Sequence, residues 1–487
     1  MSQAKFVEGS IMRHIWVMTS TATIGISTLF LVDLLDIYFL SLLGEQELAA
    51  AVGYAGTITF FTTSIGIGLA IAMGATVSKA LGAKRKDDAK RLMMSASAIT
   101  VITSLIITVI VTFLIPDLVS LIGAKGRTAE LAESYLYILI PSMPIICLAM
   151  ALGAALRAVG DAKLSMMSTI AGGLVNAILD PIFIFALGMG IEGAAVASVM
   201  ARIAVLAISY RGVFVKHQLG THLTIPELKK DFAPIFAIAG PAMLTNVATP
   251  IGNGYVTKAV AEFGDAYVAG WAVIGRIIPV AFGMIFALSG AIGPIVGQNF
   301  GAKKFDRVRQ ALTNALQFSF VYILAVSILV FLLQDYVIVG FKLGGDSAEL
   351  VSFFCSFIAV SFVFNGALFV ANASFNNLGK PKYSTFFNIG KATLGTIPFV
   401  YVGAHFWGVG GVLVGQVVGG AIFALIAVWV AYRHINNVEK EQTVEEDDTE
   451  VMTSSANPLS SSCTQMGQLC EEEGTTPQAE PQPDCRR

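Results

Sequence analysis

Three aspartates interrupt long apolar stretches in the first half of the chain. Asp33 and Asp36 lie in FLVDLLDIYFLSLLG, and Asp180 lies in LVNAILDPIFIF, where Asn176 comes one helical turn before it. If these stretches are helices, the spacings i, i+3 and i, i+4 place each pair near one helix face. A carboxylate at the centre of a membrane helix costs roughly 2.5–3.5 kcal/mol, so an acid in that position indicates a function.

Two carboxyls beside an amide can handle a coupling ion. Apolar surroundings and a neighbouring carboxyl both disfavour the charged form of an aspartate, so such an acid can load and release a proton near neutral pH. Carboxylate, amide and hydroxyl oxygens can also replace the water shell of Na⁺, because hard cations prefer oxygen ligands. Pro181 follows Asp180 and lacks a backbone donor, which leaves a carbonyl oxygen available near the acid. These residues do not distinguish H⁺ from Na⁺.

The acids could instead form structural ion pairs with basic residues in apolar stretches. The candidates are Arg202, Lys258, Arg276 and Lys391. Asp33 has the weaker case for a role in coupling, because Asp36 could act alone. Lys258 and Lys391 could line a cavity for a polar or anionic substrate, or they could extend toward an interface. Arg276 is expected to tie helices together.

The elements that carry these residues are predicted to be membrane helices. Hydrophobic residues make up 55% of the 487-residue chain and charged residues 13%, compared with about 25% charged residues in soluble domains. Apolar stretches of about 20 residues are long enough to cross a bilayer as helices. We predict an all-α integral membrane protein with twelve transmembrane helices. The predicted spans are 14–43, 52–80, 91–114, 131–153, 165–187, 191–213, 233–262, 267–298, 310–333, 348–373, 384–404 and 408–432.

The chain repeats itself at an offset of 219 residues. AMGATVSKALGAKRKDDAKR, which begins at Ala72, returns as AIGPIVGQNFGAKKFDRVRQ from Ala291, and the same offset carries Gly160 onto Gly379. Duplication in an apolar chain is typical of transporters. Because each half holds six predicted spans, the halves insert in the same direction as parallel repeats, with substrate bound between the two lobes.

Composition divides the chain into four predicted segments. The N-terminal six-helix lobe covers 1–213, a linker 214–232, and the C-terminal six-helix lobe 233–435. Residues 436–487 are acidic and rich in Ser, Thr, Pro and Gln, a composition that buries too little apolar surface to fold, so we expect a disordered tail. Lys and Arg concentrate in the loops on the side of the linker, which predicts a cytoplasmic linker and two cytoplasmic termini.

Enzyme chemistry has little support in the sequence. The five cysteines show neither metal-ligand spacing nor a disulfide framework. The five histidines are scattered, and neither a P-loop nor a Ser/His/Asp pattern is present. We therefore expect no enzymatic activity and no cofactor apart from a coupling ion, H⁺ or Na⁺.

Taken together, these motifs resemble the multidrug and toxic compound extrusion (MATE) exporters. The resemblance covers about residues 8–435 and rests on DIYFLSLLG, the two GAK loops, ALRAVGDAK, NAILDPIFIF and GIEGAAVASVMAR. It implies two six-helix lobes around a central V-shaped cavity, and export of cationic or amphipathic drugs in exchange for H⁺ or Na⁺. The chain looks like the branch whose coupling carboxylates lie in the N-terminal lobe.

Carried over by motif, the resemblance implies a cation-coupling site. Its residues would be Asp36, Asn176, Asp180 and Ser198, with Ala194 as a backbone neighbour. A Na⁺ ion, if used, would bind at Asp36, Asn176 and Asp180, and no other metal site is expected. Ser198 stands where this branch often has Thr, and it keeps the hydroxyl.

A second departure concerns the first span, which contains no proline. Thr21 stands where the second half has Pro241, so a bend of the first span at proline is not expected. Gly25 could permit a softer bend.

The leading hypothesis is a secondary multidrug exporter, working as a monomer in the plasma membrane, expected to be a bacterial inner membrane. Its expected partners are membrane lipid and small-molecule drugs, without nucleic acid. One alternative is a lipid-linked saccharide flippase of the same superfamily, which would need several cationic side chains in its cavity. Another is a membrane scaffold or sensor, which would not need paired intramembrane acids.

Overall fold

The computed structural model describes residues 4–43 and 46–455, and the regular elements of that part of the chain are all helical. The α-helices are α1 (Ile11–Ser41), α2 (Gln46–Gly82), α3 (Lys86–Leu121), α4 (Gly126–Leu139), α5 (Met143–Ala158), α6 (Ala162–Pro181), α7 (Gly190–Tyr210), α8 (Ile225–Ala261), α9 (Asp265–Gly301), α10 (Phe305–Gly340), α11 (Asp346–Phe353), α12 (Phe362–Asn377), α13 (Pro381–Gly390) and α14 (Ile397–Ser455). Short 3₁₀ or π segments are η1 (Lys5–Val7), η2 (Ile140–Ser142), η3 (Ile182–Ala186), η4 (Arg211–Lys216), η5 (Phe354–Ile358), η6 (Ala359–Ser361) and η7 (Lys391–Gly395).

Eleven helical stretches of the described chain are long and apolar enough to span a membrane. The last, Pro381–Glu441, contains two spans, because the backbone leaves the helical conformation at Trp407 and Gly408. Gly403 and Gly411 approach closely on either side of this break, where a Cβ on Gly411 would lie 1.9 Å from the Gly403 carbonyl oxygen. Glycines allow two membrane helices to approach this closely. The predicted fold of twelve transmembrane helices is confirmed.

The duplication is visible in the backbone of equivalent turns. Lys84 follows α2 with φ of 59°, and Lys303 follows α9 with φ of 57°. Gly160 and Gly379, in the turns before α6 and α13, have φ of 84° and 81°. These left-handed conformations recur at the offset of 219 residues, as parallel repeats require.

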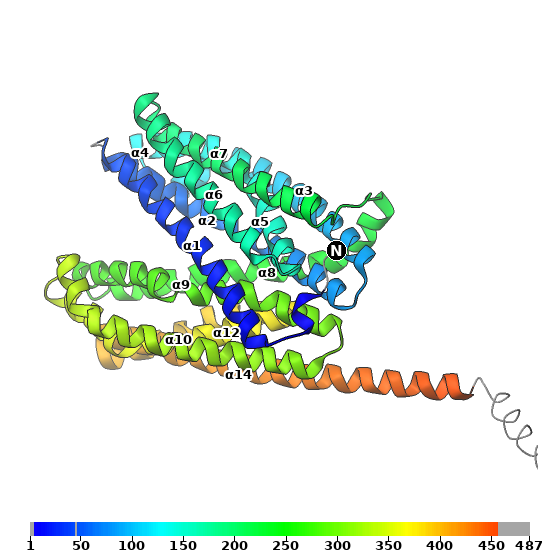
Figure 1. Ribbon diagram of the computed structural model, residues 1–487. Helices are drawn as coiled ribbons and strands as arrows, with labels where there is room; N and C mark the ends of the chain where they lie inside the picture. Colours follow the sequence, from blue (N-terminus) through cyan, green and yellow to red (C-terminus); the bar gives the residue numbers. More distant parts are fainter. Residues whose placement is uncertain (1–3, 44–45, 456–487) are drawn as a thin grey trace, which may run out of the picture. The chain divides into compact units, whose positions relative to one another are not determined.

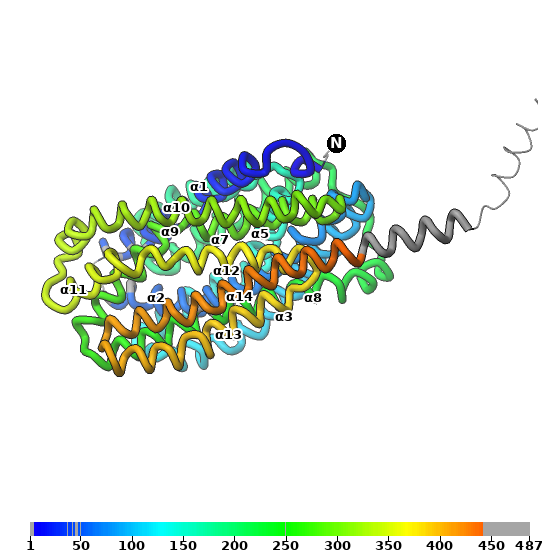
Figure 2. The backbone as a smooth tube through the Cα atoms, turned by 90° about the horizontal axis from the view of Figure 1, so that it is seen from below, coloured from blue at the N-terminus to red at the C-terminus, as the bar shows by residue number. Residues whose placement is uncertain are grey.

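Within residues 4–432, which form one compact unit, the helices make two groups corresponding to the two halves of the sequence (Figure 1). In the first half α2 packs along α3, α4 and α5, and α6 packs along α7. In the second half α9 packs along α10, α11 and α12, and Figure 2 shows α9 and α10 running side by side. The groups meet where α1 and α2 pack on α9 and where α2 packs on α8.

The seam between the halves is tightest at the end of the bundle that carries the α2–α3 and α9–α10 turns, here called the basic-loop end. A Cβ on Gly82 would lie 2.0 Å from the Gln298 carbonyl oxygen, and a Cβ on Gly301 would lie 2.0 Å from the Lys79 carbonyl oxygen. Helices α2 and α9 therefore cross backbone to backbone, through two contacts related by the 219-residue offset.

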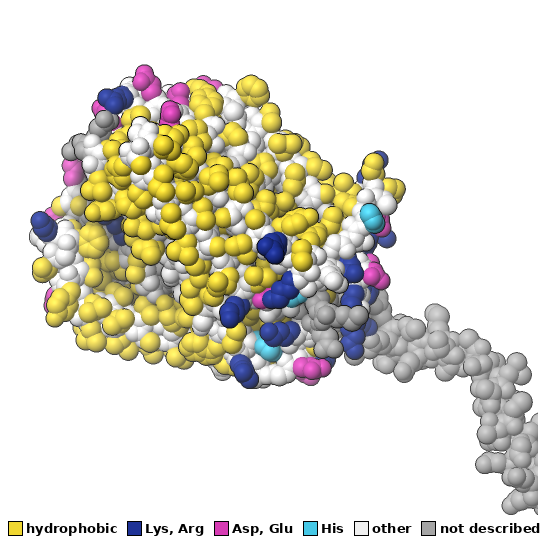
Figure 3. Space-filling view, turned by 45° about the horizontal axis from the view of Figure 1, so that its top comes forward, with side chains coloured by type: hydrophobic (Ala, Val, Ile, Leu, Met, Phe, Trp, Pro, Cys, Tyr) yellow, Lys and Arg dark blue, Asp and Glu magenta, His cyan; other side chains and the backbone are white. Residues whose placement is uncertain are grey.

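The outer surface is suited to lipid. Figure 3 shows a face covered largely by hydrophobic side chains, with most of its Lys and Arg side chains gathered at one end. Phe113, Leu121 and Val280 are 82%, 81% and 81% exposed. A soluble monomer rarely exposes so much continuous apolar surface, so the protein is a multi-pass membrane protein.

The predicted linker, 214–232, holds the end of η4, which runs through Lys216, and the start of α8, which begins at Ile225. Residues 217–224 connect the two without helical structure. Thr224 and Glu227 form a capping box that starts α8. The tail predicted to be disordered from 436 continues helix α14 to Ser455, since residues that extend an existing helix avoid the cost of nucleation. The predicted disorder of 456–487 falls outside the described residues.

Candidate functional site

Asp180 and Asn176 lie on one face of α6 and are buried, with 0% and 3% of their surface exposed. Asp161 is the N-cap residue just before this helix, and its carboxylate accepts the Leu164 N–H at 3.2 Å. The helix ends at Pro181, and the π segment η3 follows directly. A proline removes one backbone donor and disturbs the helical ladder, so Asp180 lies where the backbone hydrogen bonding changes.

The side-chain amide of Asn176 joins Asp180 to Asp36 of α1. Its Nδ2 donates to Asp180 Oδ1 at 3.0 Å and to Asp36 Oδ1 at 3.4 Å. Because one nitrogen donates to both carboxyls, the two carboxyls lie close together. Two carboxyls can hydrogen-bond to each other directly only if one of them carries a proton. Asp180 Oδ2 is buried without a hydrogen-bond partner among the described residues, which leaves one acceptor for an ion.

Close packing of α1 against α6 sets this geometry. A Cβ added at Gly173 would lie 2.7 Å from Thr28 Cγ2 and 3.1 Å from Val32 Cγ2. A larger residue would push α1 away, since overpacking in a tight contact forces side chains or backbone to shift. Gly173 comes three residues before Asn176, so this contact controls the distance between Asp36 and the amide.

Ser198 and Ala194 lie on α7. Ala194 is buried, and Ser198 lies beside the side chain of Tyr135 from α4. Within the described part of the chain, no hydrogen bond joins Ser198 to Asp36 or Asp180. Tyr135 also lies near both carboxyls, so Ser198 and the acids share this neighbour.

Asp33 lies one turn before Asp36 on α1 and is exposed. It is close enough to Asp36 for electrostatic repulsion between the two carboxylates. The structure thus places Asp36 within the cluster and Asp33 beside it.

Arg202, a predicted partner of the acids, has other partners. Its Nη1 donates to the Leu139 carbonyl oxygen at 3.1 Å and to Ser142 Oγ at 2.7 Å. These two acceptors lie at η2, between α4 and α5, so Arg202 fastens α7 to that junction. The alternative that Arg202 forms a structural ion pair with Asp36 or Asp180 is therefore wrong.

The basic residues of the second half also lack acidic partners. Lys391 donates a hydrogen bond to Asn365 Oδ1. Lys258 and Arg276 are exposed. Among the residues that the structure describes, no ion pair joins any of these three to Asp36 or Asp180, and Arg276 does not form the predicted tie between helices.

The oxygens available to a cation come from three side chains: Asp36, Asn176 and Asp180. Across residues 4–43 and 46–455, no group of three or more His, Cys, Asp and Glu side chains could hold a metal ion. The cluster therefore offers two carboxyls and an amide, a set compatible with a proton or a hard monovalent cation.

A family model described as MatE matches residues 22–182 and 241–402, one long stretch in each half and more than half of the chain. The chain belongs to the MatE family. The matched stretches include the acids of the first half and the corresponding region of the second half, so the family assignment covers both repeats of this MatE protein.

Curated relatives of the MatE protein cover most of its length. It is 26% identical over 417 residues to a FAD transporter of Shewanella oneidensis, covering 84% of this chain and 92% of the relative. It is 24% identical over 405 residues to the multidrug export protein MepA of Staphylococcus aureus, covering 82% and 88%.

Solved structures share the fold of the MatE protein. A variant of the Vibrio cholerae MATE transporter VcmN matches with a TM-score of 0.81 and 26% identity, covering 88% of this chain and 97% of that chain. Structures of a MATE protein in a bent and in a straight conformation both match with a TM-score of 0.84, at 24% and 23% identity and with 90% and 99% coverage. In the MatE protein described here, α1 is one continuous helix from Ile11 to Ser41.

Sequence reasoning missed Tyr135 as a neighbour of the acids. It lies in YLYILI, where a tyrosine is equally expected at the edge of a membrane span. Only the packing of α4 against α7 brings it to Ser198.

Proposed function

We propose that this MatE protein is a secondary exporter that moves cationic or amphipathic compounds out of the cell in exchange for H⁺ or Na⁺. The observation that supports this best is the carboxyl pair of Asp36 and Asp180, bridged by Asn176. Asp180 is buried and Asp36 half-buried, and neither has a basic partner among the described residues. Such a pair changes its charge when it takes up or releases an ion. MepA, a relative that carries the name of a multidrug exporter, supports the choice of substrates.

Ion uptake would change the attraction between α1 and α6. A shared proton allows the two carboxyls to hydrogen-bond, whereas two bare carboxylates repel each other strongly in a medium of low dielectric constant. Helix α1 also packs along α9 of the second half, and Phe6, just before α1, donates its N–H to Gln298 Oε1 at 2.8 Å. A displacement of α1 at Asp36 is therefore transmitted to the seam between the halves.

The tight seam at the basic-loop end represents one end state of such a cycle. With the predicted topology, in which both termini are cytoplasmic, this state is closed toward the cytoplasm of a bacterial inner membrane. Export then requires the seam to open while the opposite ends of the lobes approach each other, within a single monomer.

A second candidate is transport of an anionic organic compound. Lys258, Arg276 and Lys391 place three cations in the second half without acidic partners among the described residues. The Shewanella oneidensis relative is named a FAD transporter, and FAD is anionic. A lipid-linked saccharide flippase would draw on the same three cations.

Efflux from proteoliposomes tests the proposal. A fluorescent dye cation is followed under a pH gradient alone and under a Na⁺ gradient alone, for the wild type, Asp36→Asn and Asp33→Asn. We expect one gradient to drive efflux in the wild type, Asp36→Asn to lower the rate at least about tenfold, and Asp33→Asn to keep most of it. Full gradient-driven efflux by Asp36→Asn would rule out this mechanism. Transport of FAD but of no dye cation would favour the second candidate.

A further inference from the structure

The N-terminal segment fills a seat at the seam of the two halves. Lys5 lies against Gly160 and donates from Nζ to the Gly160 carbonyl oxygen at 3.2 Å. Phe6 is 1% exposed, and its N–H donates to Gln298 Oε1 at 2.8 Å. Three further side chains donate to carbonyl oxygens of Phe6, Val7 and Gly9. They are Asn299, Lys304 and Arg307. We call Gly160, Gln298, Asn299, Lys304 and Arg307 the filled seat.

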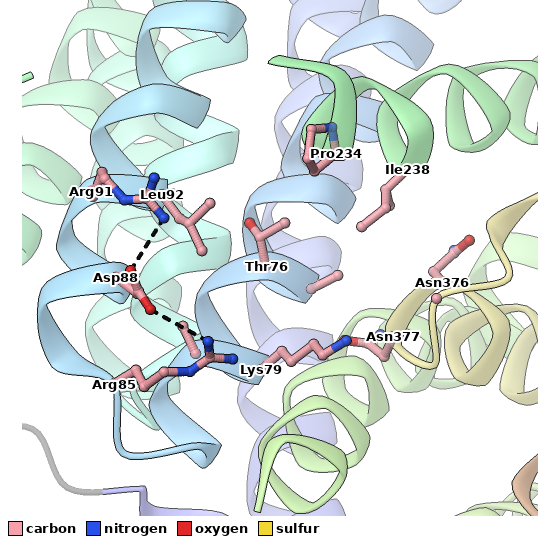
Figure 4. A pocket seen from close by; sticks show the side chains of 13 residues that line it. Thr76, Lys79, Arg85, Asp88, Arg91, Leu92, Pro234, Ile238, Asn376 and Asn377 are labelled. Atoms are coloured by element: carbon pink, nitrogen blue, oxygen red, sulfur yellow. Dashed lines mark hydrogen bonds and ion pairs between the residues drawn. The ribbon is translucent and has the colours of Figure 1, made fainter. Parts of the chain in front are cut away.

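The repeat places a second seat across the seam, and the structure has a cavity there. At the offset of 219 residues, the filled seat corresponds to Gly379, Lys79, Ala80, Arg85 and Asp88. All five line a cavity of about 250 Å³ between α2 and α3 of the first half and α8 and α12 of the second (Figure 4). One water molecule occupies about 30 Å³ in the liquid, so the cavity is large enough for a small polar group.

The second half does not fill its own seat, because its chain becomes helical too early. Lys5–Val7 form η1, and α1 begins only at Ile11. The equivalent of Phe6 is Ile225, which is already the first residue of α8. A Cβ at Gly160 would lie 2.8 Å from Lys5 Cδ, whereas a Cβ at Gly379 would have no atom within 4 Å.

One wall of the cavity is cationic. Its charged side chains are Lys79, Arg85, Arg91 and Asp88. Asp88 lies 3.6 Å from Arg85 and 3.2 Å from Arg91 (Figure 4), and Arg91 also pairs with Asp231 at 2.9 Å. The Lys79 ammonium has no ion-pair partner among the described residues and lies 4.7 Å from the centre of the Phe300 ring. Lys79 and Arg85 therefore keep donors for a ligand.

The facing wall consists of amides. Asn376 and Asn377 at the end of α12 are 5% and 6% exposed, and Oδ1 of each lacks a hydrogen-bond partner among the described residues. In Figure 4, Lys79 extends toward Asn377. Buried polar groups are normally satisfied. The unpartnered atoms here are acceptors, so this wall fits a ligand that also carries a hydroxyl donor, such as the P–OH of hydrogen phosphate or a headgroup hydroxyl of phosphatidylglycerol.

We propose that this cavity binds a phosphate group, supplied by an anionic phospholipid or by free phosphate. In the filled seat, Lys304 and Arg307 bind uncharged carbonyl oxygens. Lys79 and Arg85 have no such segment to bind, and a phosphate offers them several acceptor oxygens and a negative charge. The bound phosphate bridges α2 and α3 of the first half to α12 of the second, and it therefore stabilises the closed seam.

Thermal unfolding of the full-length protein tests the site. The melting temperature is measured in detergent with inorganic phosphate replacing chloride at constant ionic strength. It is also measured in nanodiscs of phosphatidylglycerol or of phosphatidylcholine. The test variant is Lys79→Gln with Arg85→Gln. Its matched control, Lys84→Gln with Lys86→Gln, removes the same charge from exposed residues of the same turn that do not line the cavity.

The wild type and the control should melt several degrees higher with the ligand, and the test variant should lose that increase. A saturable response to inorganic phosphate identifies free phosphate as the source, and a response to phosphatidylglycerol alone identifies the lipid. Ile238→Trp keeps every charge and fills the cavity, so it should lose the same increase, and it decides the matter if the double variant does not fold. Equal responses of the wild type, the double variant and Ile238→Trp to both ligands would overturn the proposal.

Discussion

The side-chain nitrogen of Asn176 lies 3.4 Å from a carboxyl oxygen of Asp36, although 140 residues separate the two in the chain. The same nitrogen donates to Asp180 at 3.0 Å. A single neutral donor thus serves two carboxyls from different helices. Its removal alters the geometry of the pair without altering its charge.

Asn176→Leu is therefore expected to weaken coupling while both acids remain. Loss of a hydrogen bond to a charged group is worth about 1.5–3 kcal/mol, which corresponds to a loss of roughly tenfold or more in gradient-driven efflux. Efflux from proteoliposomes measures this, with Asn314→Leu on α10 as the control. An unchanged efflux rate in Asn176→Leu would show that the amide bridge is not needed for coupling.

Gly173→Ala should separate α1 from α6. The added methyl group would meet Thr28 Cγ2 at 2.7 Å, and overpacking of this kind costs about 1–3 kcal/mol. Thr28→Ser removes that methyl group and keeps the hydroxyl that donates to the Ile24 carbonyl oxygen, so the double variant should regain stability and efflux. Gly53→Ala, where a Cβ meets nothing within 4 Å, is the matched control. Additive effects of Gly173→Ala and Thr28→Ser on the melting temperature would contradict this contact.

The sequence predicted the elements of this fold well, because its strongest signals are local. Apolar length alone defines a membrane span, and the left-handed turns at Lys84 and Lys303 recur with the same residues around them. The i, i+4 spacing of Asn176 and Asp180 also fixes their common helix face, whatever α6 packs against.

Partners between helices could not be predicted in the same way, because they depend on how each helix is rotated and how closely it approaches its neighbour. The motif pointed to Ser198 as a site residue, but it could not show that the packing of α4 on α7 places Tyr135 beside it. Arg202 could have paired with an acid, and only the position of η2 gives it the Leu139 carbonyl oxygen. The cavity beside Lys79 depends on where α8 begins, a boundary set by the capping box at Thr224.

Asp161, between α5 and α6, should make stability depend on pH. Burial raises the pKa of its carboxyl, but hydrogen bonds from Lys216 at 2.6 Å and from His217 at 2.9 Å outweigh that effect, so the pKa lies below its usual value of 3.8. A lowered folded-state pKa stabilises the fold above the unfolded pKa, and this contribution is lost as the pH falls through the folded-state pKa.

Asp161→Asn keeps a side chain that can cap α6 but removes the charge. It should destabilise the protein by about 1 kcal/mol at pH 7, and the difference from the wild type should shrink below about pH 4. Melting temperatures at pH 7 and pH 3.5 measure this, with the exposed Asp117→Asn as control. A difference that is the same at both pH values would show that the charge of Asp161 does not contribute.

Phe6→Ala should loosen the seam at the basic-loop end. Phe6 is 1% exposed, and loss of a buried phenylalanine side chain costs about 3–5 kcal/mol. Ser78, 0% exposed and adjacent to Gly297, reports on this seam when replaced by cysteine. We expect Phe6→Ala to increase the labelling rate of Ser78→Cys by a thiol reagent at least about tenfold, because each 1.4 kcal/mol of seam stability corresponds to a factor of ten in the open population.

Phe113→Ala, at a side chain that is 82% exposed, should leave the rate unchanged. If Phe6→Ala left the labelling rate at the control value, the N-terminal segment would not hold the two halves together.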